Sequence, residues 1–548
     1  MGRRRPRRGA AQADQVTNDE VRKDLREDPD SLLSPTSDPG GVAFGALGAE
    51  AGSDLNWFKM VRHRVQSRAA TSSKYPWWVL WSLLAGLLAL NFTFTVFIVD
   101  LPDVAREFHT TQGVLTWTMV GPLLANGLAA PIFGKAGDIL GHRRLYLFGL
   151  AGAGVSAVLT ALAPNVVMLL GARTLDGIQA AATGTASGAL INLVFKPEER
   201  VKAMGWWSLI GAGGPVIGVT IGSPIIAVWG WRALFWAQLV LIAVAMIVVS
   251  TVLPRRRGTP EEEARAKEKA RRDFREMDWI GSWTLSFSVT ALMLGLSFGG
   301  RVGWTSPLCM VSWIVTVLGI TIFIVRIRTA ERPLIPPHYF VTRNFVWPMV
   351  VRASANFSYF GGFFLFPILM ERGFAYSVGE VGAISIARPL TFSICSPIAG
   401  YIAVRIGEKT SAIFGMIFLT SSMGMFALLH PSTGAWYVII ALSLSGLGMG
   451  VAMPSSSAIM SHAVKSNEFG VMSAAQMLAM QVGEVAGIQV METLQSTLAR
   501  RRGLQDALAG NPQLLATFHW PFVVGGAVGC LGIVGAFFYK QFERPPRR

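Results

Sequence analysis

One stretch decides the fold of this chain: Gly134-Lys135-Ala136-Gly137-Asp138-Ile139-Leu140-Gly141-His142-Arg143-Arg144. It lies between two segments that are long and apolar enough to cross a bilayer. Gly134 and Gly141 allow a tight turn and a close approach of helices. Asp138 sits where helix dipoles and the arginines that follow can hold it in one conformation. We interpret the stretch as a two-state latch, and a generic basic turn is the alternative.

The composition indicates a membrane protein. The chain has 548 residues, of which 51% are hydrophobic and 15% charged, whereas soluble domains carry roughly 25% charged residues. A spanning helix needs about 20 mostly apolar residues. Fourteen such runs are present, at 77–101, 113–134, 145–163, 166–194, 203–229, 231–253, 278–299, 305–326, 345–370, 378–403, 410–430, 434–462, 468–495 and 516–539. The expected fold class is an all-α polytopic membrane protein.

The basic residues behind the net charge of +16 are concentrated in loops between the apolar runs. Segment 254–277 holds nine Lys or Arg, and alternate loops are basic while those between them carry none or one. This alternation is the positive-inside pattern, so we expect both termini in the cytoplasm and a location in the cell (plasma or inner) membrane. Because the loops account for the basic charge, we expect no nucleic-acid partner. Arg500, Arg501 and Arg502 disagree, because they would lie outside. The first apolar run begins too late for a signal peptide.

The expected organisation has seven parts. They are a mostly disordered cytoplasmic tail at 1–75, an N-terminal six-helix bundle at 76–253, a charged cytoplasmic segment at 254–277, an inserted helix pair at 278–326, a cytoplasmic loop at 327–344, a C-terminal six-helix bundle at 345–540 and a second tail at 541–548. Within the first tail, residues 54–68 fit either a helix on the membrane surface or a solvated linker.

The two bundles repeat one pattern. Gly134 and Gly141 have counterparts in Gly400 and Gly407, 266 residues later, and Asp176-Gly177-Ile178 matches Ser445-Gly446-Leu447, 269 residues later. Parallel repeats of this kind place a substrate site near the bilayer midplane, between two bundles that rock against each other.

The opening stretch matches Gly-x-x-x-Asp-x-x-Gly-x-Arg-Arg at every position. That is the pattern of the loop between helices two and three in the major facilitator superfamily, which the chain resembles over about residues 75–540. The resemblance implies the superfamily fold, here with two six-helix bundles and a central inserted pair. It assigns the latch to Gly134, Asp138, Gly141, Arg143 and Arg144.

Helix four carries an arginine and an acid, Arg173 and Asp176, three residues apart on one helical face. The superfamily pattern has an arginine and a glycine at Arg173 and Gly177, and implies proton transfer there. It usually has glutamine where this chain has Asp176. Two interpretations of Asp176 stay open: a proton carrier, or a permanent counter-ion of Arg173.

Helix five contains Gly211, Gly214, Pro215 and Gly218. Small residues at these spacings allow close helix packing, and the proline predicts a kink. Ordinary membrane packing is one reading. Gly-Pro-x-x-Gly in this helix also resembles the antiporter branch of the superfamily. Together with fourteen helices and Trp231-Arg232, it points to the fourteen-helix drug:proton antiporters.

Helix one departs from that family. The family has an aspartate in mid-helix, where this chain has Thr93, with Asn91 nearby. Asp100, near the outer end, is a remaining proton-coupling candidate, although a solvated terminal acid is the simpler interpretation.

The second half offers Glu484 in helix thirteen and Arg388 in helix ten. Glu484 is a second proton-carrier candidate or a contact for a cationic substrate. A Glu484–Arg388 pair that holds the bundle is the alternative, and for Arg352 in helix nine the alternative to a functional charge is snorkelling to the cytoplasmic surface. Aromatic residues with few polar groups suit an amphipathic or cationic molecule. The substrate-cavity candidates are Asn91, Trp117, Asn126, Gln179, Phe357, Tyr359, Arg388 and Gln481.

The predicted function is proton-coupled export of amphipathic or cationic organic compounds, as in drug efflux. The rivals are an exporter of one endogenous metabolite, lipid or siderophore, an importer, and a transport-inactive scaffold or sensor. No catalytic triad, metal-ligand set or phosphate-binding loop is visible, so we expect no enzyme, metal or cofactor. The expected partners are a small organic substrate, protons and the lipid bilayer, with the chain as a monomer.

Overall fold

The computed structural model describes residues 74–93, 101–110, 112–115, 117–253, 260–504 and 507–541. Several expectations lie outside these residues. They are the first tail with its helix at 54–68, Asp100, the side chain of Pro215 and the end of the second tail.

The N-terminal half is built from six long helices. They are α3 (Tyr75–Asn91), α7 (Trp117–Leu140), α8 (His142–Ala161), α9 (Val166–Val194), α10 (Arg200–Trp229) and α11 (Trp231–Val252), with short helices α5 (Leu101–Glu107) and α6 (Gln112–Leu115) between α3 and α7. Local chemistry sets the helix starts. Asn165 accepts a hydrogen bond from the Met168 amide at the start of α9, and Gly141, with φ of 96°, joins α7 to α8.

The C-terminal half has the same plan. Its helices are α15 (Arg343–Ile368), α16 (Val378–Ser385), α17 (Ala387–Ile406), α18 (Glu408–Ala427), α19 (Ala435–Ser461), α20 (Phe469–Arg501), α21 (Pro512–Leu515) and α22 (His519–Phe537). Short 3-10 turns η3 (Pro337–Val341) and η5 (Ser466–Glu468) precede α15 and α20. Gly407 joins α17 to α18 with φ of 93°, as Gly141 does in the first half.

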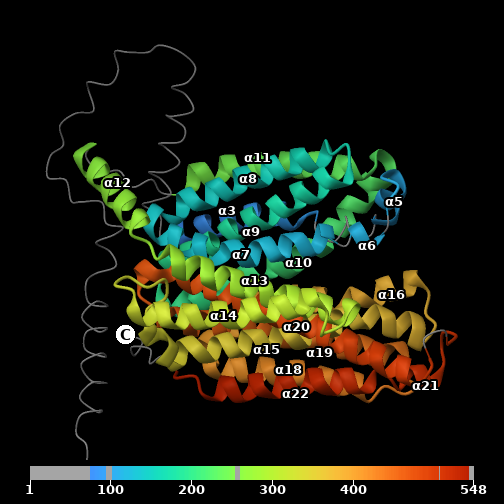
Figure 1. Ribbon diagram of the computed structural model, residues 1–548. Coiled ribbons are helices and arrows are strands. Elements are labelled where there is room, and N and C mark those ends of the chain that lie inside the picture. The colour runs from blue at the N-terminus through green and yellow to red at the C-terminus, as the bar shows by residue number, and fades with distance from the viewer. Residues whose placement is uncertain are drawn as a thin grey trace, which may run out of the picture. The chain divides into compact units, whose positions relative to one another are not determined.

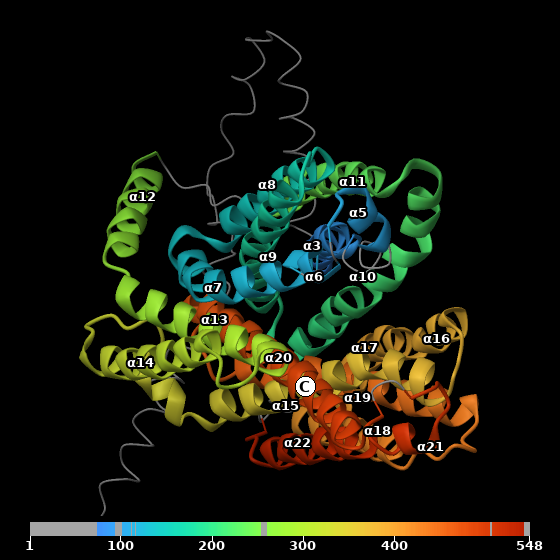
Figure 2. The same ribbon diagram turned by 45° about the vertical axis from the view of Figure 1, so that its right-hand side comes forward.

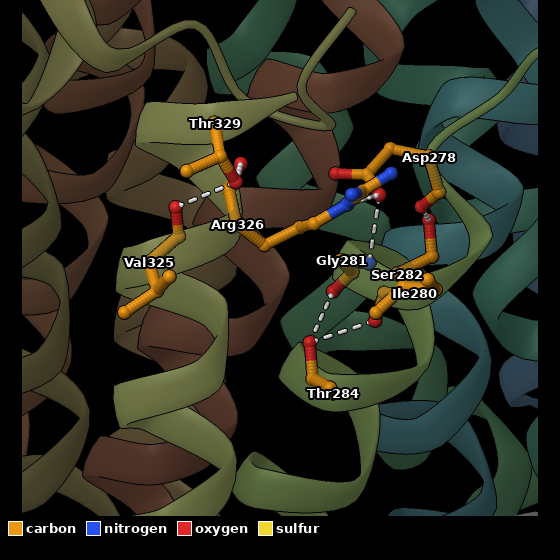
Figure 3. Close-up of polar contacts among 8 residues, drawn as sticks. All are labelled: Asp278, Ile280, Gly281, Ser282, Thr284, Val325, Arg326 and Thr329. Atoms are coloured by element: carbon orange, nitrogen blue, oxygen red, sulfur yellow. Dashed lines mark hydrogen bonds and ion pairs between the residues drawn. The ribbon is translucent and has the colours of Figure 1, made fainter. Parts of the chain in front are cut away.

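The inserted pair consists of α13 (Trp279–Val302) and α14 (Pro307–Thr329), and α12 (Pro260–Arg275) precedes it. Figure 3 shows how the pair is tied together at one end. Buried Asp278 accepts from the Gly281 amide at 2.9 Å and from Arg326 Nε at 3.0 Å, so one carboxylate starts α13 and binds α14.

Each of the fourteen predicted segments overlaps a long helix of the described residues. Among the described residues, ten helices are long and apolar enough to cross a membrane. The other four are α3, whose described part is 17 residues long, and α7, α9 and α10, which are rich in glycine, alanine and threonine. The chain is thus a multi-pass membrane protein, and the count of fourteen spans stays a prediction.

Glycine contacts confirm that the halves are repeats. A Cβ built on Gly177 of α9 would collide with the Pro122 carbonyl of α7. A Cβ built on Gly446 of α19 would collide with the Arg388 carbonyl of α17. The two pairs are related by the offsets of 266 and 269 residues seen in the sequence, so the same helix–helix contact occurs in each half.

The halves meet along two seams. In the first seam α7 packs against α20, and in the second α10 packs against α17 (Figure 2). Helix α13 lies against both α7 and α20, whereas α14 packs chiefly on α13. Figure 1 places α12 at one end of the helices and α5 and α16 at the other, which we call the α12 end and the α5 end.

Candidate functional site

The turn between α7 and α8 binds the start of α20, across the first seam. Asp138 Oδ1 accepts a hydrogen bond from the Gly470 amide at 2.7 Å, and Oδ2 accepts one from the Val471 amide at 3.1 Å. These amides belong to the first turn of α20, where unpaired N–H groups and the helix dipole favour an anion. The carboxylate therefore joins the two halves at the α12 end.

Gly134 allows this contact by letting α7 and α20 touch. A Cβ built on Gly134 would lie 2.6 Å from the Ala474 Cβ and 2.7 Å from the Gly470 carbonyl oxygen. Any side chain at this position would push the helices apart, and the carboxylate of Asp138 would lose its amides.

His142 is the third partner of Asp138. Its Nε2 lies 3.2 Å from Asp138 Oδ1, and both side chains are buried. The imidazole fills a slot between two glycines: a Cβ on Gly137 would lie 2.7 Å from Nδ1, and a Cβ on Gly470 would lie 2.9 Å from Cε1. The histidine is thus packed inside the seam.

The arginines of the turn have other surroundings. Arg143 Nη2 donates to the Ser250 carbonyl at the end of α11, at 3.0 Å, and Arg144 is exposed. The contacts that hold Asp138 include His142 and the two α20 amides, and the role of the arginines in the latch stays a prediction.

Two further residues complete the contact at this end. Arg200, at the start of α10, donates to the Ser461 carbonyl at 3.2 Å and stacks on the Phe469 ring at 5.0 Å. Tyr339 of η3 donates to the Glu468 carboxylate, just before α20. Burial and this hydrogen bond raise the pKa of Tyr339, so the phenol stays a donor.

The acid of helix four is neutralised within its own helix. Arg173 Nη1 lies 3.0 Å from Asp176 Oδ2, and Gln179 Nε2 donates to Oδ1 at 2.8 Å. Arg173 is buried and also stacks on the Phe235 ring. Of the two interpretations of Asp176, this geometry favours the permanent counter-ion.

Glu484 has the opposite surroundings. It is partly buried in α20, and among the described residues it has neither a hydrogen bond nor an ion pair. The backbone at Gly483 and Gly487 packs on α15, and Gln481 reaches Gly127 of α7. By helical spacing, Glu484 lies on the face between these two contacts.

Arg388 does not pair with Glu484. Its side chain is 0% exposed and points into the C-terminal half, where Nη1 donates to the Tyr359 carbonyl at 3.1 Å. The guanidinium also lies over the rings of Tyr359 and Phe426. Arg352, for which snorkelling was an alternative, is buried too and donates to Ser457 at 2.8 Å.

The glycines of α10 face two helices. Gly214 lies against α3, where a built Cβ would be 2.9 Å from the Asn91 Cβ. Gly213 lies against α17, where a built Cβ would be 2.9 Å from the Ser393 Oγ. Gly218 is buried and Gly211 is exposed, with open space around it. Thr93, at the position of the missing acid, donates to Gln238 at 3.3 Å.

The remaining cavity candidates are divided among several helices. The Trp117 ring lies 5.3 Å from the Phe298 ring of α13, and the Asn91 amide donates to its own helix at Leu87. Asn126 has a buried carbonyl oxygen without a partner in the described chain. Gln179, Phe357, Tyr359 and Gln481 are buried. Their contact with substrate stays a prediction.

This geometry can be compared with known proteins. The model of the Major Facilitator Superfamily matches residues 82–488 and 349–548, which is most of the chain. The chain belongs to the Major Facilitator Superfamily.

Relatives in the superfamily cover about three quarters of the chain. Multidrug resistance protein Stp of Mycobacterium tuberculosis is 25% identical over 409 residues, 74% of this chain and 73% of that protein. The tetracenomycin C resistance and export protein of Streptomyces glaucescens is 25% identical over 422 residues, 77% of this chain and 76% of that protein.

A solved structure supports the superfamily fold. The proton:xylose symporter XylE, bound to 6-bromo-6-deoxy-D-glucose, aligns with a TM-score of 0.59 and 13% identity. The alignment covers 86% of this chain and 97% of that one. At this identity the likeness concerns the fold alone.

Sequence reasoning missed His142, Gly470 and Arg200. His142 is part of the superfamily stretch and lies four residues after Asp138, one helical turn away. This spacing could have indicated a contact between the imidazole and the carboxylate. Gly470 and Arg200 begin helices after short polar turns, but nothing in their local sequence names the partner across the seam.

Proposed function

We propose that this superfamily member exports amphipathic or cationic organic compounds across the cell membrane in exchange for protons, with both termini in the cytoplasm. The names of the relatives, which include a multidrug resistance protein and a resistance and export protein, support export of organic compounds. The basic loops support the orientation, in which the α12 end is cytoplasmic. The chain works as a monomer.

The proposed proton coupling rests on the observation that Glu484 has neither a hydrogen bond nor an ion pair among the described residues. An unpaired carboxylate in a membrane protein is expensive in its charged form, so its charge state is free to change. Asp176 keeps a guanidinium at 3.0 Å and is the less suitable carrier. We therefore assign the proton to Glu484 and a structural role to Asp176.

The proposed cycle starts from the conformation seen here, with the first seam closed at the cytoplasmic end. Glu484 takes a proton from outside and loses its charge, which favours opening of the cytoplasmic end. Substrate binding and loss of the proton to the cytoplasm then favour closure. The drive comes from the different affinities of the two states for the two ligands.

Flux in proteoliposomes tests this cycle. The probe is tetraphenylphosphonium, with an imposed pH gradient. Glu484→Gln should abolish gradient-driven flux, whereas Asp176→Asn should keep a gradient dependence at reduced rate. Glu492→Gln, an exposed acid two turns along α20, is the matched control and should behave as the parent. Gradient-driven flux in Glu484→Gln equal to that of the parent contradicts the assignment.

A single-compound exporter is the second candidate, because one relative is named for tetracenomycin C alone. The same vesicles separate the two: a multidrug exporter moves several unrelated cations such as tetraphenylphosphonium and ethidium, and a single-compound exporter does not.

A further inference from the structure

We propose that Nδ1 of His142 is a second proton-binding site, and that a proton held there keeps the first seam open. The proposal rests on the orientation in the proposed function, which places this seam at the cytoplasm. It does not depend on Glu484 as the carrier.

The contact with Asp138 fixes which nitrogen takes the proton. Asp138 already accepts two amide hydrogen bonds, and an ionised carboxylate can only accept. Nε2 of His142, at 3.2 Å from Oδ1, must therefore carry a hydrogen in the neutral and in the charged imidazole. Protonation of His142 in the closed seam can only add a hydrogen at Nδ1.

The closed seam offers that hydrogen no acceptor. Nδ1 is buried and has no hydrogen-bond partner among the described residues. It faces Gly137, where even a Cβ would come within 2.7 Å. A charged N–H in this position would be desolvated and unpaired, which is among the more expensive states of a polar group.

Asp138 attracts a charged imidazole less strongly because of its other partners. Its charge is already met by the Gly470 and Val471 amides at the positive end of the α20 dipole. Two cations are also near this end of the seam. Arg143 follows on the same helix, bound to Ser250, and Arg200 of α10 is bound to Ser461.

The other charged groups of the surrounding elements are Glu468, Lys465, Lys135 and Arg144. Glu468 of η5 accepts from Tyr339 of η3, and Lys465 lies one turn earlier with its amide on the same phenol. Lys135 of α7 precedes the turn and is partly exposed. His142 is thus the group at this contact whose charged form would lack an acceptor in the closed seam, so we infer that its second proton leaves before the seam closes.

For transport, the consequence is that the seam can close only after His142 has lost its second proton. When the seam opens, Nδ1 meets cytoplasmic water and takes a proton. When the seam closes, that proton returns to the cytoplasm, so it is not carried across and the overall stoichiometry is unchanged. A more acidic cytoplasm holds more carriers open to the inside.

Distance measurements across the seam test the proposal. Spin labels are attached to Leu140→Cys on α7 and Asn467→Cys in η5, both exposed, in a chain whose three cysteines are replaced. Distances are measured in lipid nanodiscs from pH 5.5 to 8.5. The closed fraction should rise with pH, with a change of at most about tenfold in the closed-to-open ratio per pH unit for one proton.

Two substitutions isolate the imidazole. In His142→Gln the amide still donates to Asp138 but cannot titrate, so the closed fraction should no longer change with pH. In His142→Arg the permanent cation should keep the seam open throughout. The proposal is overturned if His142→Gln keeps the parent's pH dependence, or if the parent's closed fraction falls as pH rises. His142→Asn is a second non-titrating variant for the case that glutamine prevents folding.

The same labels separate this proposal from the proposed function. With Glu484→Gln added, gradient-driven flux should vanish while the pH dependence of the distance remains. Loss of that pH dependence in Glu484→Gln shows that the seam follows Glu484 and overturns a proton site at His142. Retained flux in Glu484→Gln contradicts the carrier assignment alone.

Discussion

The two seams share a backbone contact and differ in chemistry. In the first, Gly134 of α7 packs on the Gly470 backbone of α20; in the second, Gly400 of α17 packs on the Val201 carbonyl of α10, with a built Cβ at 2.8 Å. The position that matches Asp138 by the repeat offset is Val404. Around it Val201, Ala403 and Ala458 form an apolar cluster. Duplication kept the glycines and left the carboxylate in one seam only, so a carboxylate that binds helix amides can control only the first seam.

The largest effect should come from the shared glycines. Gly134→Ala and Gly400→Ala each place a methyl group within 2.8 Å of a backbone oxygen across a seam. Overpacking costs about 1–3 kcal/mol, so the closed-to-open ratio should fall about five- to hundredfold in both. The label pair of Leu140→Cys and Asn467→Cys reports it. Gly171→Ala, which meets nothing within 4 Å, is the control. A normal ratio in Gly400→Ala would show that the second seam does not need its glycine.

The next effect should come from the carboxylate. Asp138→Asn keeps the shape and loses hydrogen bonds to a charged acceptor, which are worth roughly 1.5–3 kcal/mol each, so the first seam should open more than tenfold more often. Adding Val404→Asp places a carboxylate opposite the start of α10, and part of the closed population should return, again measured with the labels. No recovery in a folded double variant would mean that the seams differ in shape as well as in chemistry.

A smaller effect is expected at the start of α10. Arg200→Lys keeps the charge and loses the stacking on Phe469 and the fit to Ser461. Cation–π contacts and hydrogen bonds of this kind contribute about 1 kcal/mol, so the closed-to-open ratio should fall about fivefold. Lys196→Gln, which removes an exposed cation one turn before α10, should leave the ratio unchanged. An unchanged ratio in Arg200→Lys would mean that the charge at this position, and not its stacking or its hydrogen bond, keeps the seam closed.

The smallest effect concerns the α5 end, away from both seams. Partial burial would raise the pKa of Glu107, but hydrogen bonds from Trp231 and Arg232 outweigh it and hold the pKa below 4.5. Stability from this pair is thus complete above about pH 4.5 and is lost as pH falls through the lowered pKa. Glu107→Gln should lower the free energy of unfolding near neutrality by less than about 1 kcal/mol, seen as a slightly lower Tm, and should remove part of the acid sensitivity. Thermal unfolding followed by tryptophan fluorescence measures this. A changed label distance in Glu107→Gln would couple this end to the seams.

The sequence predicted what depends on local pattern. Among the described residues, each apolar run coincides with a long apolar helix, and the spacing of Gly134 and Gly177 predicted the duplication that their contacts confirm. The partner of Gly134 could not be predicted, because it lies in the other half of the chain. For the same reason the histidine of the quoted stretch passed unnoticed until Gly470 closed the slot around it.

Side-chain direction was the second limit. Arg388 stood in an apolar helix and was expected at the cavity or near Glu484, but its guanidinium turns inward to the Tyr359 carbonyl. Helical spacing alone does not say which face of a wholly apolar helix meets lipid, cavity or bundle interior. For Asp176 the local spacing was sufficient, since its partners Arg173 and Gln179 are on the same helix. The roles of these residues in transport stay predictions.

The inserted helix α13 has a consequence for the speed of the molecule. It touches α7, where Met293 reaches Gly127, and α20, where Gly300 meets Thr493. A motion that parts α7 from α20 must therefore slide α13 along one of them. We expect such sliding to slow the motion in both directions. Helix α13 would thus slow the exchange between the two states. Truncating its contact residues should change the turnover rate of the carrier more than the ratio of its two states.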